Sequence, residues 1–257
     1  MRRQGRPWGR RIASKALEVG TLALLTLSKP VQDLMRSKSL LGDRTFFDRG
    51  SFRWIPFLEA RWGVIRAELD EVLRYTDDIP NFQDISEENR VLTTDDRWKT
   101  FFFYGWGLKV AGNCERCPRT AELLQSIPGM KSAFFSILMP RKHIPAHRGP
   151  YTGVLRYHLG LRVPDPASCR IRVGADICHW REGESLIFDD TYEHEVWNDS
   201  DEIRVVLFVD VARPLPAGPA KINAAIIWLI ARSSLARPAL GRLRSWDLRL
   251  ARVWSRA

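Results

Sequence analysis

Histidine is scarce in this chain of 257 residues, and its five copies all lie between positions 143 and 194. His147 stands where a predicted strand ends, just before Gly149-Pro150, and His194 follows an acidic turn. If the fold brings these two strand ends together at the mouth of a small barrel, the imidazole nitrogens of His147 and His194 can bind a divalent metal ion. The alternative is that both are ordinary surface histidines.

A second group of polar side chains lies within two predicted strands. Arg204 interrupts the apolar run 203–209. A guanidinium that faces a barrel interior is costly unless an anion meets it, and its planar fork matches a carboxylate. The alternative is an outward-facing Arg204 paired with a neighbouring acid. Arg156 and His158 alternate with apolar residues, so both point to one face of their strand.

The segments that must position these residues have the residue pattern of β-strands. Runs rich in β-branched, aromatic and aliphatic residues predict strands over 133–139, 154–161, 169–173, 185–188, 193–197 and 203–211. Turns rich in Pro, Gly, Asp and Asn separate them, which is typical of an antiparallel sandwich or barrel. Earlier in the chain, apolar spacing predicts helices over 10–27, 54–73 and 121–127, and the polar segment 77–96 predicts a loop.

The net charge of +10 is unevenly distributed along the chain. Residues 1–50 carry a net +7, residues 51–212 a net −5, and residues 213–257 a net +8. The acidic middle is long enough to bury its own core. We therefore expect a basic N-terminal arm (1–50), a globular domain (51–214, with a helical lead-in over 51–130 and the barrel over 131–214) and a basic C-terminal arm (215–257).

The C-terminal arm predicts an amphipathic helix. Leu243, Trp246 and Leu250 recur at helical spacing, with arginines largely on the opposite side. A basic helix with Trp on its apolar face is typical of a segment that lies in an anionic membrane surface. The alternative is that its apolar face docks on the protein's own core. The aromatic residues face away from the charge, so the pattern does not favour nucleic-acid binding.

The sequence predicts a peripheral rather than a spanning relation to a membrane. The apolar stretches 19–28 and 222–231 are each about half as long as a membrane-spanning helix requires. The Arg-rich N-terminus matches a signal peptide only loosely, because Lys15 and Glu18 interrupt its apolar run. We therefore expect the protein in the cytoplasm, at the inner face of the cytoplasmic membrane.

Five ordered motifs, all within residues 147–214, carry a family resemblance. They are His147–Pro150, Leu155–Leu161, Trp180–Glu184, Phe188–Asn198, and Arg204 with Asp210–Pro214. Together they resemble the aspartyl/asparaginyl β-hydroxylase family of iron(II)- and 2-oxoglutarate-dependent oxygenases. Within it, the chain is most similar to the bacterial lipid A acyl-chain hydroxylases, and ornithine-lipid hydroxylases share much of the pattern. The resemblance implies a mainly β fold with flanking helices, whose core is a double-stranded β-helix of the jelly-roll, cupin-like kind.

The resemblance also implies a role for each site residue. His147 and His194 would be the iron ligands. Arg204, helped by Ser136, would pair with the distal carboxylate of 2-oxoglutarate, and Arg156 and His158 would face this cosubstrate. Many such oxygenases have a carboxylate two positions after the first histidine, where this chain has a glycine. The family shares this departure and is thought to leave water there, and Asp190 is the nearest candidate to hold that water.

The implied reaction consumes O2 and 2-oxoglutarate, releases succinate and CO2, and hydroxylates an acyl chain of a membrane lipid such as lipid A or an aminolipid. Two alternatives stay open: hydroxylation of an Asp or Asn side chain in a protein, and a cupin-like binding protein without catalysis. Separately, Cys114 and Cys117 form a Cys-x-x-Cys pair that could be half of a zinc site or a redox pair.

Overall fold

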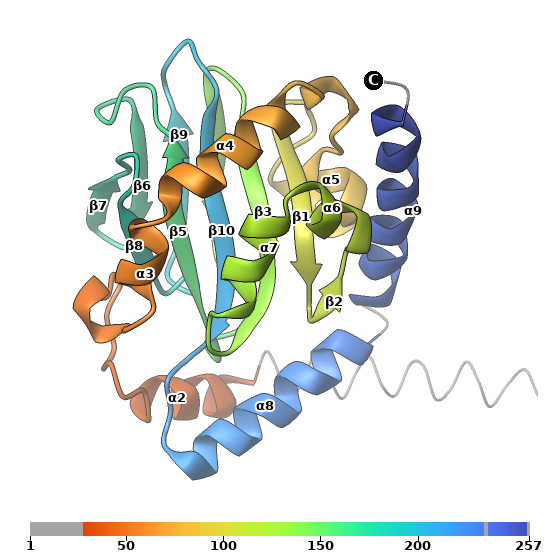
Figure 1. Ribbon diagram of the computed structural model, residues 1–257. Helices are drawn as coiled ribbons and strands as arrows, with labels where there is room; N and C mark the ends of the chain where they lie inside the picture. The colour runs from red at the N-terminus through yellow and green to blue at the C-terminus, as the bar shows by residue number, and fades with distance from the viewer. Residues whose placement is uncertain (1–27, 234–235, 256–257) are drawn as a thin grey trace, which may run out of the picture.

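The computed structural model describes residues 28–233 and 236–255. It contains two antiparallel sheets that face each other (Figure 1). The six-stranded sheet has the order β2-β1-β3-β10-β5-β8, and the four-stranded sheet has the order β4-β9-β6-β7. The strands of the larger sheet are β1 (Trp98–Gly105), β2 (Leu108–Lys109), β3 (Met130–Leu138), β5 (Val154–Arg162), β8 (Ser185–Phe188) and β10 (Arg204–Ala212). Those of the smaller sheet are β4 (Lys142–His147), β6 (Cys169–Val173), β7 (Asp176–His179) and β9 (His194–Asn198).

From β3 onward, eight strands are divided equally between the two sheets, and the chain crosses repeatedly from one sheet to the other. This is the double-stranded β-helix, a jelly roll. The prediction of a mainly β jelly roll with flanking helices is confirmed.

Period-2 alternation assigns each side chain of the central strands to one of two layers. In β10, Val205 and Leu207 belong to the core between the large sheet and the helices, whereas Val206 belongs to the core between the two sheets. The same holds in β5, where Leu155 and Tyr157 face the helices. Residues at the intervening positions of β5 and β10 therefore point into the barrel, which is where the functional side chains lie.

Helices cover the outer face and the β1 edge of the large sheet (Figure 1). Helices α4, α6 and α7 lie over the outer face, and α9 stands beside β1 and contacts α5 and α6. The α-helices are α2 (Lys29–Ser37), α3 (Ile55–Glu59), α4 (Trp62–Leu73), α5 (Phe82–Ile85), α6 (Ala111–Arg116), α7 (Pro118–Gln125), α8 (Ala217–Arg232) and α9 (Ala236–Trp254).

The C-terminal helices pack on the domain. Leu243 and Leu250 of α9 are buried, and the Trp254 ring lies 4.1 Å from that of Tyr75 between centroids. The apolar face of α9 therefore docks on the protein's own core, and the expectation that this face contacts a membrane is wrong. The packing buries apolar surface that would otherwise face water. No helix among the described residues is long and apolar enough to span a membrane.

Several boundaries differ from the expectations. The helix expected over 54–73 is interrupted at residues 60–61, and the segment expected as a loop over 77–96 contains α5 and two short 3-10 helices. Strands β1, β2, β4 and β7 were not predicted. Every residue of β1 is buried, so it shows no alternation. The helix expected over 10–27 lies outside the described residues.

Candidate active site

One pocket inside the jelly roll brings together side chains from both sheets. Its lining includes six of the seven site residues expected from the sequence: Ser136, His147, Arg156, His158, His194 and Arg204. The seventh, Asp190, contacts Arg156 from the turn between β8 and β9, with its Oδ2 3.0 Å from Arg156 Nη2. Residues separated by almost 70 positions in the sequence thus share one site.

The two histidines face each other across the β4–β9 pair. His147 and His194 are direct partners in that pairing, and their ring centroids lie 4.0 Å apart. His147 Nδ1 lies 2.8 Å from the Pro145 carbonyl oxygen, and His194 Nδ1 lies 3.0 Å from that of Tyr192. Because a carbonyl oxygen can only accept, both Nδ1 atoms carry the proton. Each Nε2 therefore keeps its lone pair, as a metal ligand requires.

Burial also keeps both imidazoles neutral. It lowers the pKa of His147, and burial together with the nearby His147 and Arg156 lowers the pKa of His194 to about 3. A neutral imidazole is the form that binds a metal, so neither histidine must first lose a proton near neutral pH.

The position that supplies a carboxylate in many related sites is filled differently here. Among the described residues, no cluster of three His, Cys, Asp or Glu side chains could hold a metal ion. A Cβ at Gly149 would lie 2.0 Å from Asp190 Oδ2, so the Asp190 carboxylate occupies the space of a side chain at position 149. Asp190 is buried, and its carboxylate pairs with Arg156. The site offers two nitrogen ligands with a buried carboxylate beside them.

Arg204 supplies a buried positive charge for an anion. It is 2% exposed, and its Nε and Nη1 have no hydrogen-bond partner within the described part of the chain. Its guanidinium lies over the Trp180 ring, 4.3 Å from the centroid. Burial lowers its pKa to about 10, so it remains charged at neutral pH. An unpaired buried guanidinium is costly, and a ligand carboxylate would satisfy it.

His158 and Ser136 add hydrogen-bonding groups to the pocket that contains Arg204. Neither ring nitrogen of the buried His158 has a partner among the described residues. Burial and the positive charge of Arg204 lower its pKa well below the ordinary value, so the ring is neutral and has one N–H to donate. Ser136 Oγ accepts from Trp98 Nε1 at 3.1 Å, which leaves the hydroxyl proton available to a ligand.

A buried ion pair that the sequence analysis did not single out supports the turn carrying Asp190. Asp189 and Arg213 are both fully buried and pair through Oδ2 and Nη2. Thr191 donates its backbone N–H to Asp189 Oδ1 at 3.0 Å, and Arg213 donates to the Thr152 carbonyl oxygen. Arg213 lies in one of the motifs that carry the family resemblance, but no local sequence pattern predicts its contact with Asp189, 24 positions earlier.

The Cys-x-x-Cys pair is remote from this chemistry. Cys114 and Cys117 are buried, and burial raises the pKa of Cys114 to about 11 and that of Cys117 further. They pack in the core beneath the helices, whereas Cys169 packs in the core between the sheets. The half-site hypothesis is therefore wrong for the described residues, and these thiols are protonated core residues.

Comparison with known proteins fits this geometry. The family model for aspartyl/asparaginyl β-hydroxylase matches residues 59–214, more than half of the chain. The chain belongs to this family. The match contains every residue of the pocket, so the resemblance drawn from the sequence motifs is confirmed.

Two relatives of this β-hydroxylase-family protein have named activities. It is 47% identical over 208 residues to the ornithine lipid ester-linked acyl 2-hydroxylase of Rhizobium tropici, which covers 80% of this chain and 74% of that protein. It is 34% identical over 172 residues to human aspartyl/asparaginyl β-hydroxylase, covering 65% of this chain but only 22% of the human protein. Among solved structures, a cupin barrel-domain protein from Salinispora arenicola matches 53% of this chain and 92% of its own, with 11% identity and a TM-score of 0.32.

Proposed function

We propose that this protein is an iron(II)- and 2-oxoglutarate-dependent dioxygenase that hydroxylates an acyl chain of an amino-acid-containing or lipid A-like membrane lipid. The observation that carries the proposal is the juxtaposition of two Nε2 lone pairs with an unpaired buried guanidinium in one pocket. A metal alone would need only the histidines, and an anion alone would need only Arg204. A cosubstrate that chelates the metal at one end and carries a carboxylate at the other uses both.

The pocket fits these groups by its own chemistry. His147 and His194 would hold iron(II) through Nε2, and two imidazoles leave open coordination positions for a chelating cosubstrate and O2. Arg204 would receive the distal carboxylate of 2-oxoglutarate, with the Ser136 hydroxyl as a second donor. When bound, the iron and 2-oxoglutarate would supply the oxidising chemistry that produces succinate and CO2.

The remaining residues of the pocket would balance its charge and orient the bound groups. Burial opposes the charge on Arg156, but Asp190 and Asp210 outweigh it and raise its pKa, so it stays positive beside the metal position. His158 stays neutral and can donate without adding charge. Asp190 is held by Arg156 and fills the side-chain space of Gly149, two residues after His147, where it would orient water. This division between ligands and orienting partners is usual at metal sites.

The lipid substrate is supported by the rhizobial relative, whose named substrate is the ester-linked acyl chain of ornithine lipid. A membrane position is supported by α8. This helix exposes Ile222, Trp228 and Leu229, and the guanidinium of Arg232 lies 4.1 Å from the centre of the Trp228 ring. An exposed apolar face with Trp and flanking cations suits the surface of an anionic membrane.

We place this surface in the cytoplasm. All four cysteines are free, as expected for a reducing compartment. The apolar part of the proposed membrane contact thus moves from the expected α9 to α8, while α9 keeps its basic outer side.

The experiment is turnover of purified protein with iron(II), ascorbate and 2-oxoglutarate in vesicles that contain ornithine lipid or lipid A. We expect lipid-dependent succinate and a lipid product heavier by one oxygen atom. His194→Ala should abolish both, whereas the matched variant His143→Ala should retain them, because His143 lies outside the pocket and pairs with Glu195 on the surface. Lack of turnover with every lipid would refute the proposal. An added oxygen on a peptide Asp or Asn alone would favour the protein-hydroxylase alternative.

A further inference from the structure

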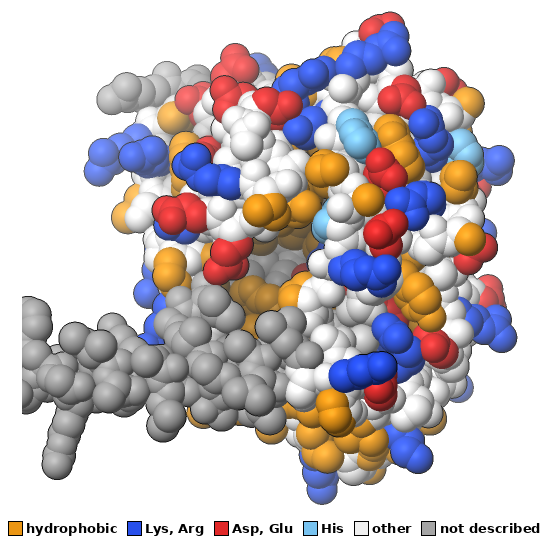
Figure 2. All heavy atoms as spheres, turned by 180° about the vertical axis from the view of Figure 1, so that it is seen from behind, with side chains coloured by type: hydrophobic (Ala, Val, Ile, Leu, Met, Phe, Trp, Pro, Cys, Tyr) orange, Lys and Arg blue, Asp and Glu red, His pale blue; other side chains and the backbone are white. Residues whose placement is uncertain are grey.

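A second, larger cavity of about 320 Å³ adjoins the histidine pocket. Arg156 and Phe208 line both spaces, so the two lie next to each other at the inner side of β5 and β10. Its volume is roughly twice that of a ~150 Å³ apolar cavity able to hold benzene. Figure 2 shows the corresponding side of the molecule hollowed and bordered by hydrophobic side chains. We call this cavity the apolar groove.

The floor of the apolar groove is a row of stacked aromatic rings. Phe208 lies 4.1 Å from Phe134 between ring centroids, and Phe134 lies 4.4 Å from Phe102. These rings come from three adjacent strands, β10, β3 and β1. The opposite wall is α9, which contributes Leu240 and Leu243. The row therefore leads away from the histidine pocket along an apolar path.

Three charged residues line the groove: Glu88, Arg156 and Asp210. Arg156 and Asp210 both line it, but they pair with each other at 3.3 Å where the groove meets the histidine pocket. The guanidinium of Arg156 covers the Phe208 ring at 4.3 Å from the centroid. A peptide lying along the aromatic floor would bury N–H and C=O groups against side chains that offer no partner, at a high cost in free energy. A hydrocarbon chain carries no such groups.

The groove also reaches the surface that would meet a membrane. Ile230 of α8 and Ala236 of α9 line it, and Ile230 directly follows the exposed Trp228 and Leu229 on α8. A chain leaving the bilayer beside the exposed face of α8 would thus meet the groove at Ile230. This continuity favours a lipid over a soluble apolar ligand.

From this arrangement we infer that the apolar groove holds the acyl chain of the substrate while a carbon at its Arg156 end lies beside the histidine pair. The inference rests on the proposed function and adds the location and length selectivity of the chain. Gly105 and Ala239 set the width: a Cβ at Gly105 would lie 2.7 Å from Leu243 Cδ1, and Ala239 has only a methyl group facing the groove. Helix α9 is therefore a specificity element.

The first test is chain-length selectivity. Ala239→Trp would fill part of the groove, and each excluded pair of methylenes should cost about tenfold in affinity. We expect kcat/KM to fall at least tenfold for a lipid with a stearoyl chain and to change less than about twofold for one with an octanoyl chain. The control is Ala251→Trp on the same helix, at an exposed position outside the groove, which should leave both values unchanged. An equal effect of Ala239→Trp on both lipids would overturn the inference and leave the proposed function intact.

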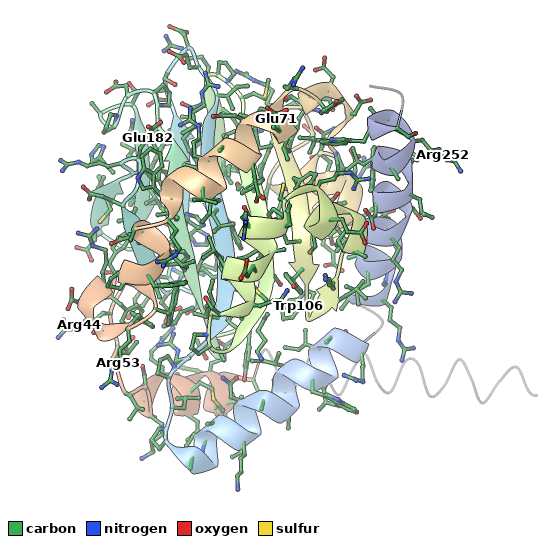
Figure 3. The ribbon with its side chains drawn as sticks, viewed as in Figure 1. Arg44, Arg53, Glu71, Trp106, Glu182 and Arg252 are labelled. Carbon is green, nitrogen blue, oxygen red and sulfur yellow. The ribbon has the colours of Figure 1, made fainter. Side chains whose placement is uncertain are left out.

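The second test does not depend on turnover. Trp106 lines the groove at the β1–β2 turn, where Figure 3 labels it. Metal-free protein titrated with a dibrominated stearate should lose tryptophan fluorescence through contact quenching. Trp106→Phe should remove at least half of that quenching, and Ala239→Trp should weaken binding about tenfold or more. Quenching that is unchanged in Trp106→Phe, or absent in wild-type protein, would overturn the inference even if lipid turnover is observed. Quenching at Trp106 without turnover of any lipid would support the groove and refute the proposed reaction.

Discussion

Replacing Arg204 by methionine should stabilise the ligand-free protein while removing its response to the cosubstrate. Burial holds the pKa of Arg204 near 10 instead of 12.5. At 1.36 kcal/mol per pKa unit, the charged form costs about 3 kcal/mol in the folded state. The group is charged in both states at pH 7, so this penalty is fully present there and is relieved only as pH rises past 10.

The net gain should be smaller than this penalty. Water that enters the pocket offsets part of it, and the variant loses the contact with Trp180. We expect Arg204→Met to raise the free energy of unfolding by about 1–2 kcal/mol, which corresponds to a rise in Tm of roughly 5 °C for a protein of this size. A buried charge replaced by an apolar side chain of similar volume often has this effect.

Thermal unfolding with and without ligand is the assay. The ligands are 2-oxoglutarate and a divalent metal that does not react with O2, both at about 100 times Kd. They should raise the free energy of unfolding of wild-type protein by about 2.7 kcal/mol or more. Arg204→Met should gain only the metal's share. The control Arg162→Met removes a partly exposed arginine paired with Glu202 and should preserve the response. Destabilisation of ligand-free Arg204→Met by more than about 1 kcal/mol, or an unchanged response to 2-oxoglutarate, would refute the reasoning.

Three further predictions test the site and its support. Burial lowers the pKa of His194 to about 3, below its unfolded value of about 6.5, so the stability that is present above pH 6.5 is lost as the pH falls. Between pH 7.5 and pH 5, the free energy of unfolding of the metal-free wild-type protein in urea should therefore fall by about 2 kcal/mol more than that of His194→Gln. Parallel losses in the two proteins would contradict this. Gly149→Ala should displace the Asp190 carboxylate and weaken metal binding about tenfold or more by calorimetric titration, whereas wild-type affinity would show that this space is not needed. Arg213→Met should cost about 3–5 kcal/mol because it leaves Asp189 buried and unpaired, and adding Asp189→Leu should recover part of that loss; a double variant as unstable as the single one would refute this explanation.

Much of the site could be predicted because strand alternation and side-chain chemistry are local. Leu155 and Tyr157 alternate with Arg156 and His158, and this alone places the last two on one face. The motifs around His147 and His194 then identified the family. The sequence left open whether Arg204 faces inward, since a single arginine in an apolar strand fits either face.

The sequence by itself thus determined the chemical groups, the face each shares along its strand, and the jelly-roll class. Only the tertiary structure decided which of those faces meet. The His147–His194 pairing, the missing partner of Arg204 and the Asp189–Arg213 pair all depend on contacts between distant segments. The position of α9 also depends on such contacts, because its apolar face could pack equally well against a bilayer or against a protein core. In the folded protein α9 packs against its own core beside β1, and it thereby forms one wall of the apolar groove.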